Sequence, residues 1–125
     1  MTIRGAIGMA DELEPNQVDY FNKVIWLSVL DQQVYTEILQ THEGMPEDME
    51  MPLYDYSTDV DTELLIPDQY GAVVYSEYLR MKINEAVNET DRMSLAAQMF
   101  RDAYRRYADW YNRTNKPKSV GVWRF

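Results

Sequence analysis

The spacing of hydrophobic residues along the chain predicts three long helices. Apolar side chains recur at steps of three and four over residues 16–41, 67–88 and 91–112, which is the period of a helix with one buried face. Pro67 suits the first turn of the second helix. A further short turn of helix over residues 8–13 has only a weak signal.

The segment between the first two predicted helices lacks a helical period. Met45-Pro46 and Met51-Pro52 disfavour helix there, because proline excludes the α region for the residue before it. Residues 54–56 and 63–66 suit short extended pieces that could pair with each other. Because this segment is rich in Asp and Glu, residues 45–66 are named the acidic arm.

These elements predict an all-α fold, a small bundle of three main helices with an irregular acidic arm and an extended C-terminal tail. Residues 1–115 are expected to form the helical domain, and residues 116–125 the tail, where Pro117 ends helical structure. A chain of 125 residues is long enough to build one hydrophobic core. No stretch approaches the roughly 18 consecutive apolar residues that indicate a membrane span.

Charge is divided unevenly along the chain. Residues 24–79 contain twelve Asp and Glu and no Lys or Arg, whereas residues 101–125 contain seven basic and two acidic side chains. The last 25 residues therefore carry +5 and the first 100 carry −14, which together give the net charge of −9. A chain that meets copies of itself can use such a division to attract and orient unlike faces. The alternative is a solvated acidic face beside a basic last helix, without a partner.

Residues that could carry catalysis or hold a metal are scarce. The chain has no Cys and a single histidine, His42, which is expected at the surface near a helix end. Residues 59–63 (DVDTE) copy the first alternating ligands of a calcium loop, but Leu64 and Tyr70 stand where that loop needs Gly and Glu. There is no glycine-rich phosphate loop and no nucleophile motif. The sequence thus predicts a protein without an active site, a metal site or a cofactor.

Surplus aromatic residues and the basic C-terminal region indicate contacts with other proteins. Tyr54 and Tyr56 exceed what the helical core needs, and aromatic residues are enriched at interfaces. The third predicted helix adds arginines expected to contact a neighbouring subunit: Arg101, Arg105, Arg106 and Arg113. The tail suits anchoring or strand addition on another protein, with a frayed terminus as the alternative. The tail residues that would dock are Val120, Val122, Trp123, Arg124 and Phe125.

Five runs of residues carry a resemblance to a known family. They are residues 61–70 (DTELLIPDQY), 74–79 (VYSEYL), 99–104 (MFRDAY), 107–114 (YADWYNRT) and 26–31 (WLSVLD). Together the chain resembles the small helical head–tail connector proteins, also called adaptors, of tailed phages and prophages. None of these runs is a catalytic signature, and the tail after Asn115 has no counterpart in the resemblance.

The resemblance implies a structural protein of the virion neck, made in the cytoplasm of the bacterial host. Copies would form a ring of about a dozen subunits beneath the portal vertex of the capsid. The implied partners are the chain itself, the portal protein and a downstream neck or tail-completion protein. The ring would help to retain or pass the packaged genome, so DNA would cross its channel without specific binding, and no membrane would be involved. The tail would then dock on the portal.

The acids of the arm have two possible roles within such a ring. They could complement the basic helix of a neighbouring subunit, or they could line the channel, where an acidic wall would not hold DNA phosphates. The sequence does not decide between these roles. The acids concerned are Glu47, Asp48, Glu50, Asp55, Asp59, Asp61 and Glu63.

Two other classes of function stay open on the sequence alone. One is a small helical module that binds a single protein partner through its C-terminal tail without forming a ring. The other is a helical nucleic-acid binder that uses the arginines of the last helix as phosphate contacts, although Asp102 and Asp109 interrupt them. An enzyme is the least favoured class.

Overall fold

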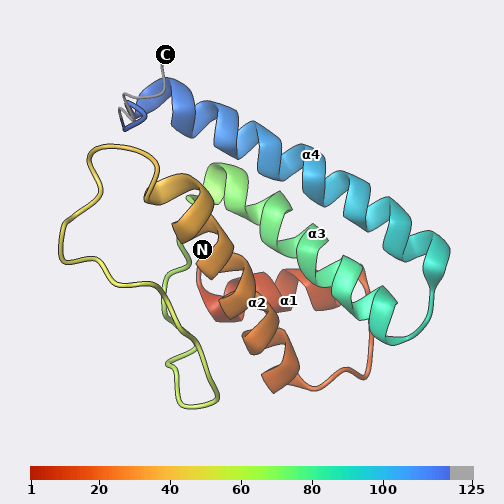
Figure 1. Cartoon of the computed structure of the whole chain (residues 1–125). Coiled ribbons are helices and arrows are strands. Elements are labelled where there is room, and N and C mark those ends of the chain that lie inside the picture. Colours follow the sequence, from red (N-terminus) through yellow and green to blue (C-terminus); the bar gives the residue numbers. More distant parts are fainter. Residues whose placement is uncertain (119–125) are drawn as a thin grey trace.

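A computed structural model describes residues 1–118 of the chain. Within that range the fold is all-α (Figure 1). It has four α-helices and one π-helical turn, which are α1 (Ile3–Leu13), α2 (Tyr20–Val34), η1 (Tyr35–Leu39), α3 (Asp68–Ala86) and α4 (Thr90–Thr114). The only β-type pairing between these residues consists of two isolated bridges. No helix in the described part of the chain is both long enough and apolar enough to cross a membrane.

Helix α1 is the main difference from the sequence prediction, which expected only a weak turn over residues 8–13. The helix begins at Ile3, and the Thr2 hydroxyl caps it by accepting a hydrogen bond of 3.0 Å from the Gly5 amide. Its buried positions follow a helical period: Ile3, Ala6, Ile7 and Ala10. Gly5 and Gly8 lower the helix propensity of this stretch and mask that period. The described fold therefore contains four α-helices, where three were expected to dominate.

Helix α3 is the centre of the fold. Figure 1 shows it between α4 on one side and the pair α1 and α2 on the other, and it contacts all three. A tight turn containing Asn88, whose φ is 62°, joins α3 to the antiparallel α4. Aromatic side chains fill the contact between these two helices, with ring centroids 5.1 Å apart for Tyr78 and Phe100 and 5.4 Å apart for Tyr70 and Trp110. Tilted ring pairs at such distances add stability beyond the area that they bury.

Helix α2 continues directly into η1, so the two form one rod. In η1 the Gln40 amide donates to the carbonyl oxygen of Tyr35, five residues earlier, at 2.9 Å. This wider turn accommodates one extra residue. It allows Tyr35, Ile38 and Leu39 all to face the core. The predicted helix of residues 16–41 is therefore a shorter α-helix followed by a π turn.

The acidic arm pairs with the N-terminus of the chain, and not with itself. The amides of Ile3 and Arg4 donate to the carbonyl oxygens of Thr62 (3.1 Å) and Val60 (2.9 Å), and the Leu64 amide donates to Met1 (2.8 Å). The expected pairing between residues 54–56 and 63–66 is not what the structure shows. The exposed first backbone amides of α1 need acceptors, and the arm supplies them.

The end of the described chain lies against the end of η1. Residues 116–118 are extended, with the Glu43 amide donating to the carbonyl oxygen of Lys116 and the Lys118 amide donating to that of Thr41, both at 2.8 Å. The docking residues predicted for the tail lie outside the described residues: Val120, Val122, Trp123, Arg124 and Phe125.

The sequence prediction for His42 was wrong, because this side chain is buried and not at the surface. Its Nε2 lies 3.1 Å from Asn112 Oδ1 on α4, and its Nδ1 lies 2.6 Å from the carbonyl oxygen of Ile38. Its ring meets that of Tyr111 edge-on, with centroids 4.9 Å apart. His42 thus holds the end of η1 against α4.

Candidate protein interface

Asp31 on α2 is the centre of a buried polar cluster. Its side chain is completely buried, and its two oxygens accept three hydrogen bonds. Tyr54 Oη donates at 2.6 Å, Tyr75 Oη at 2.5 Å, and the backbone amide of Leu65 at 3.0 Å. Burial raises the pKa of Asp31, and these hydrogen bonds offset only part of that effect.

This cluster fixes the acidic arm to the helices. Two of its donors, Tyr54 and Leu65, belong to the arm, and the third, Tyr75, belongs to α3. The Tyr75 hydroxyl also accepts from the Ile66 amide at 2.9 Å, and burial beside Asp31 raises the pKa of Tyr75 well above its usual value. Each hydroxyl and amide is thereby satisfied without water. The polar groups of the cluster are committed to holding the arm, and Asp31 presents no surface to solvent.

The charged side chains of α2 face the interior of the protein. Only two charged residues fall within it, Lys23 and Asp31, and both are buried. Lys23 Nζ lies 2.8 Å from Asp11 Oδ1 on α1, so this buried charge is paired as well. Burying both charges leaves the solvent side of the helix without any.

The solvent side of α2 instead carries an apolar stripe. Phe21, Ile25 and Val29 lie four residues apart in turn, which places them on one stripe, and they are 37%, 36% and 51% exposed. Tyr56 of the arm extends the stripe, since its ring meets Phe21 edge-on with centroids 5.7 Å apart. We call these four residues the outer face. An exposed apolar stripe of this kind is typical of a surface that another protein covers, and the isolated chain leaves this stripe of α2 open to solvent.

A hollow of about 290 Å³ opens at one end of the outer face. The first turn of α2 forms one wall and the loop of residues 55–60 forms the other. Its lining contains apolar and aromatic side chains together with two carboxylates, and it has no Lys or Arg. The lining residues are Asp19, Tyr20, Phe21, Val24, Asp55, Tyr56, Thr58 and Val60.

The arginines predicted to contact a neighbour lie exposed along α4. Arg101, Arg105, Arg106 and Arg113 are all at the surface, and of these only Arg105 forms an ion pair among residues 1–118, with Asp102 at 3.4 Å. By contrast, each of the five basic side chains before residue 100 is within 4 Å of an acid of the same chain. Positive charge that the fold itself does not neutralise is thus concentrated on α4.

The acids of the arm fall into three groups. Those near α1 are paired within the chain, with Asp61 lying 3.1 Å from Arg4 and Glu63 lying 2.9 Å from the amino group of Met1. Asp55 and Asp59 accept hydrogen bonds from amides two residues later in their own turns, and the bonds from Ser57 lower the pKa of Asp55. The third group is exposed and forms neither an ion pair nor a side-chain hydrogen bond among the described residues: Glu47, Asp48 and Glu50.

The two tyrosines predicted for a subunit interface have different positions. Tyr54 is only 5% exposed, because its hydroxyl is bonded to Asp31 and its amide donates to Ser28 Oγ at 2.9 Å. Tyr56 is 85% exposed. The buried ring of Tyr54 supports the arm from inside, so of the pair only Tyr56 can meet a second chain.

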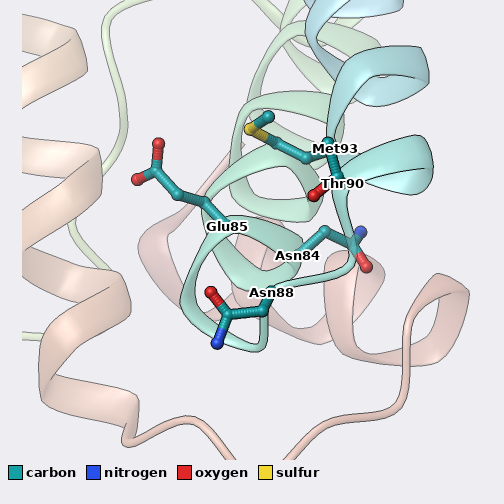
Figure 2. Close-up of a pocket in the computed structure, with 5 residues that line it drawn as sticks. All are labelled: Asn84, Glu85, Asn88, Thr90 and Met93. Atoms are coloured by element: carbon teal, nitrogen blue, oxygen red, sulfur yellow. The ribbon is translucent and has the colours of Figure 1, made fainter.

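A second hollow, of about 210 Å³, lies at the turn between α3 and α4 (Figure 2). It is lined by Asn84, Glu85, Asn88, Thr90 and Met93. The labelled side chains point in different directions, and the Asn84 amide nitrogen is already bonded to Glu14 Oε1 at 3.0 Å. Diverging side chains give a ligand no common point of contact. Among residues 1–118 there is also no group of three or more His, Cys, Asp or Glu placed to hold a metal ion.

Comparisons with protein-family models, with curated proteins and with solved structures found no match to this chain.

Sequence reasoning missed the outer face, although the signal was present. The first predicted helix contains more apolar residues than one buried stripe can use, and Lys23 and Asp31 fall at positions within the buried stripe. When a helix has enough apolar residues for two faces and its charged residues lie on only one of them, both faces are expected to be covered by protein.

Proposed function

We propose that the chain is a structural subunit that assembles head-to-tail with copies of itself, as a head–tail connector does. The observation that carries this proposal is the outer face, an exposed apolar stripe on α2, while the two charged residues of that helix are buried. Exposed apolar surface of this kind is typical of a site for protein contact.

The positions of α2 and α4 support an interface between unlike surfaces. Both helices pack on α3, and Figure 1 shows them on different sides of it. The outer face is bordered by acids such as Asp19 and Asp55, whereas α4 carries the basic surface. Two complementary surfaces on different sides of one subunit produce a head-to-tail contact, and a head-to-tail contact that closes produces a ring.

The identity as a connector rests on the sequence resemblance and is compatible with an all-α subunit of this size. In such a ring, Glu47, Asp48 and Glu50 either face the channel or meet a neighbour's arginines. They are suited to both roles because they are exposed and carry no internal ion pair among residues 1–118. The portal protein and a downstream neck protein remain the proposed partners, and the virion neck remains the proposed location.

Mass measurement across a range of protein concentrations tests this function, combined with electron microscopy of the largest species. We expect closed rings of a single size, formed by the chain alone or on its portal. A species that contains one copy under all these conditions would favour the module that binds a single partner. A twofold dimer as the only contact would also contradict the proposal, because it pairs like surfaces.

A further inference from the structure

The hollow beside Phe21 has the size and chemistry of a socket for an aromatic side chain. Its volume of about 290 Å³ is just below the usual range for pockets that hold small-molecule ligands. Phe21, Val24, Tyr56 and Val60 provide apolar walls. Aromatic anchors that enter such pockets dominate the energetics of protein interfaces.

The charges around the hollow indicate the charge that the residues beside that aromatic side chain should carry. Asp19 and Asp55 both border it, and no basic residue does. The pKa of Asp55 is held below its usual value by hydrogen bonds from Ser57, so this carboxylate is ionised at neutral pH. A peptide segment that carries a cation beside an aromatic ring would therefore match the charge of the site.

The chain carries such a segment at its C-terminus. Trp123, Arg124 and Phe125 place an arginine between two aromatic residues. We infer that this segment of one copy occupies the hollow of a neighbouring copy, with an aromatic ring against Phe21 and Tyr56 and the guanidinium near Asp19 and Asp55. The inference rests on the proposed assembly, and it assigns to the next subunit a segment that the sequence analysis expected to dock on the portal.

The length of the chain after Lys118 favours a segment that comes from another copy. The Lys118 amide is bonded to Thr41 at the far end of the rod formed by α2 and η1. Twenty residues separate Thr41 from Phe21, which is about 30 Å at the rise of a helix. Seven residues separate Lys118 from Phe125, and a fully extended chain spans about 24 Å over that length. The backbone of a copy's own segment therefore falls short of Phe21, and we assign the hollow to the segment of the next subunit.

Cross-linking between differently labelled copies tests this inference. Phe125 of the full chain is replaced by the photo-reactive benzoylphenylalanine, and this protein is mixed with an equal amount of full-length chain uniformly labelled with ¹⁵N. The mixture is irradiated at protein concentrations up to millimolar. Mass spectrometry should then find residue 125 of the unlabelled chain joined to residues 19–24 or 55–60 of the ¹⁵N-labelled chain. Cross-links to α4 or to the same copy would overturn the inference, as would the lack of any cross-link.

Two variants of the labelled chain make the test specific. Tyr56→Ala should lower the yield of the cross-link about tenfold, as the loss of an interface anchor does. Leu53→Ala is the matched control, since Leu53 is also exposed (73%) in the arm but does not line the hollow, and its yield should equal that of the unaltered chain. Both side chains are largely in solvent, so both variants should keep the melting temperature of the parent. Equal yields for the two variants would contradict the inference.

The outcome can be separated from that of the proposed function. Closed rings in which residue 125 is cross-linked elsewhere would refute the socket and leave the ring intact. A cross-link at the hollow in a species that never exceeds two copies would support the socket and refute the ring.

Discussion

The hydroxyl of Tyr54, in the acidic arm, donates a hydrogen bond of 2.6 Å to Oδ2 of Asp31 on helix α2. These residues are 23 positions apart, and their contact turns an irregular segment into part of the folded core. The arm can hold Tyr56 against Phe21 because the neighbouring Tyr54 is fixed in this way.

Removing the acceptor should therefore cost much of the stability. We expect Asp31→Ala to lower the free energy of unfolding by at least about 3 kcal/mol, because it leaves three buried donors without a partner. Tyr54→Phe, which removes one donor, should cost about 2 kcal/mol, because it leaves a buried carboxyl oxygen with one partner fewer. Urea denaturation followed by circular dichroism measures both. An Asp31→Ala protein as stable as its parent would show that the cluster does not hold the arm.

Titration of Asp31 should make the free energy of unfolding depend on pH. Burial raises the pKa of this carboxyl above its ordinary value of 3.8. The folded state then binds more protons than the unfolded state between pH 3.8 and the raised pKa, so stability attributable to Asp31 falls as pH rises through that window. Asp31→Asn cannot titrate and should lack this fall.

Denaturation of the parent and of Asp31→Asn at a series of pH values checks the sign. The difference in unfolding free energy, parent minus variant, should decrease from pH 3.8 upwards and become constant above the raised pKa. A difference that increases with pH would mean that hydrogen bonding outweighs burial at this site.

A charge on the outer face should prevent assembly without unfolding the subunit. Val29→Lys changes a half-exposed side chain, so the free energy of unfolding should stay within about 0.5 kcal/mol of the parent. Placing an ammonium group in an apolar contact should nevertheless weaken association more than tenfold. Sedimentation velocity over a concentration range gives the measurement. Ala86→Lys, which adds the same charge at the exposed end of α3, is the control and should assemble normally.

Reversing charge on α4 tests the other half of the same contact. Arg106→Glu and Arg113→Glu alter exposed arginines that form no ion pair among residues 1–118, so stability should be nearly unchanged. Assembly of the double variant should be weaker than that of the parent at low salt, and the two should converge as salt screens the parent's attraction. If the parent retains nucleic acid with a steep salt dependence and the double variant does not, α4 would be a nucleic-acid surface and not a subunit contact.

The long helices could be predicted from local features alone. Residues 67–88 and 91–112 were expected, and α3 (Asp68–Ala86) and α4 (Thr90–Thr114) agree within about two residues. Pro67, the N-cap of α3, and the regular apolar steps of both helices are enough to define them, since these signals lie in the helices or directly beside them.

The arm and the candidate interface could not be predicted in the same way. The bonds that hold the arm join Asp31 to residues 23, 34 and 44 positions away, and no local pattern indicates such pairs. Tyr54 and Tyr56 look equivalent in the sequence, yet one is buried and the other is exposed. Their difference depends on Asp31, whose own burial is decided by the packing of three separate segments.

The π turn η1 has a consequence for how this chain could vary in length. Elsewhere in the rod, deleting one residue would rotate everything beyond it by about 100° and misplace either the outer face or His42. A π turn holds one residue more than an α turn, so a deletion between Tyr35 and Leu39 would restore a regular helix and keep both ends in phase. Relatives of this protein could therefore lack one residue at η1. A gap at η1 in an alignment would then leave the outer face before it and the position of His42 after it unchanged.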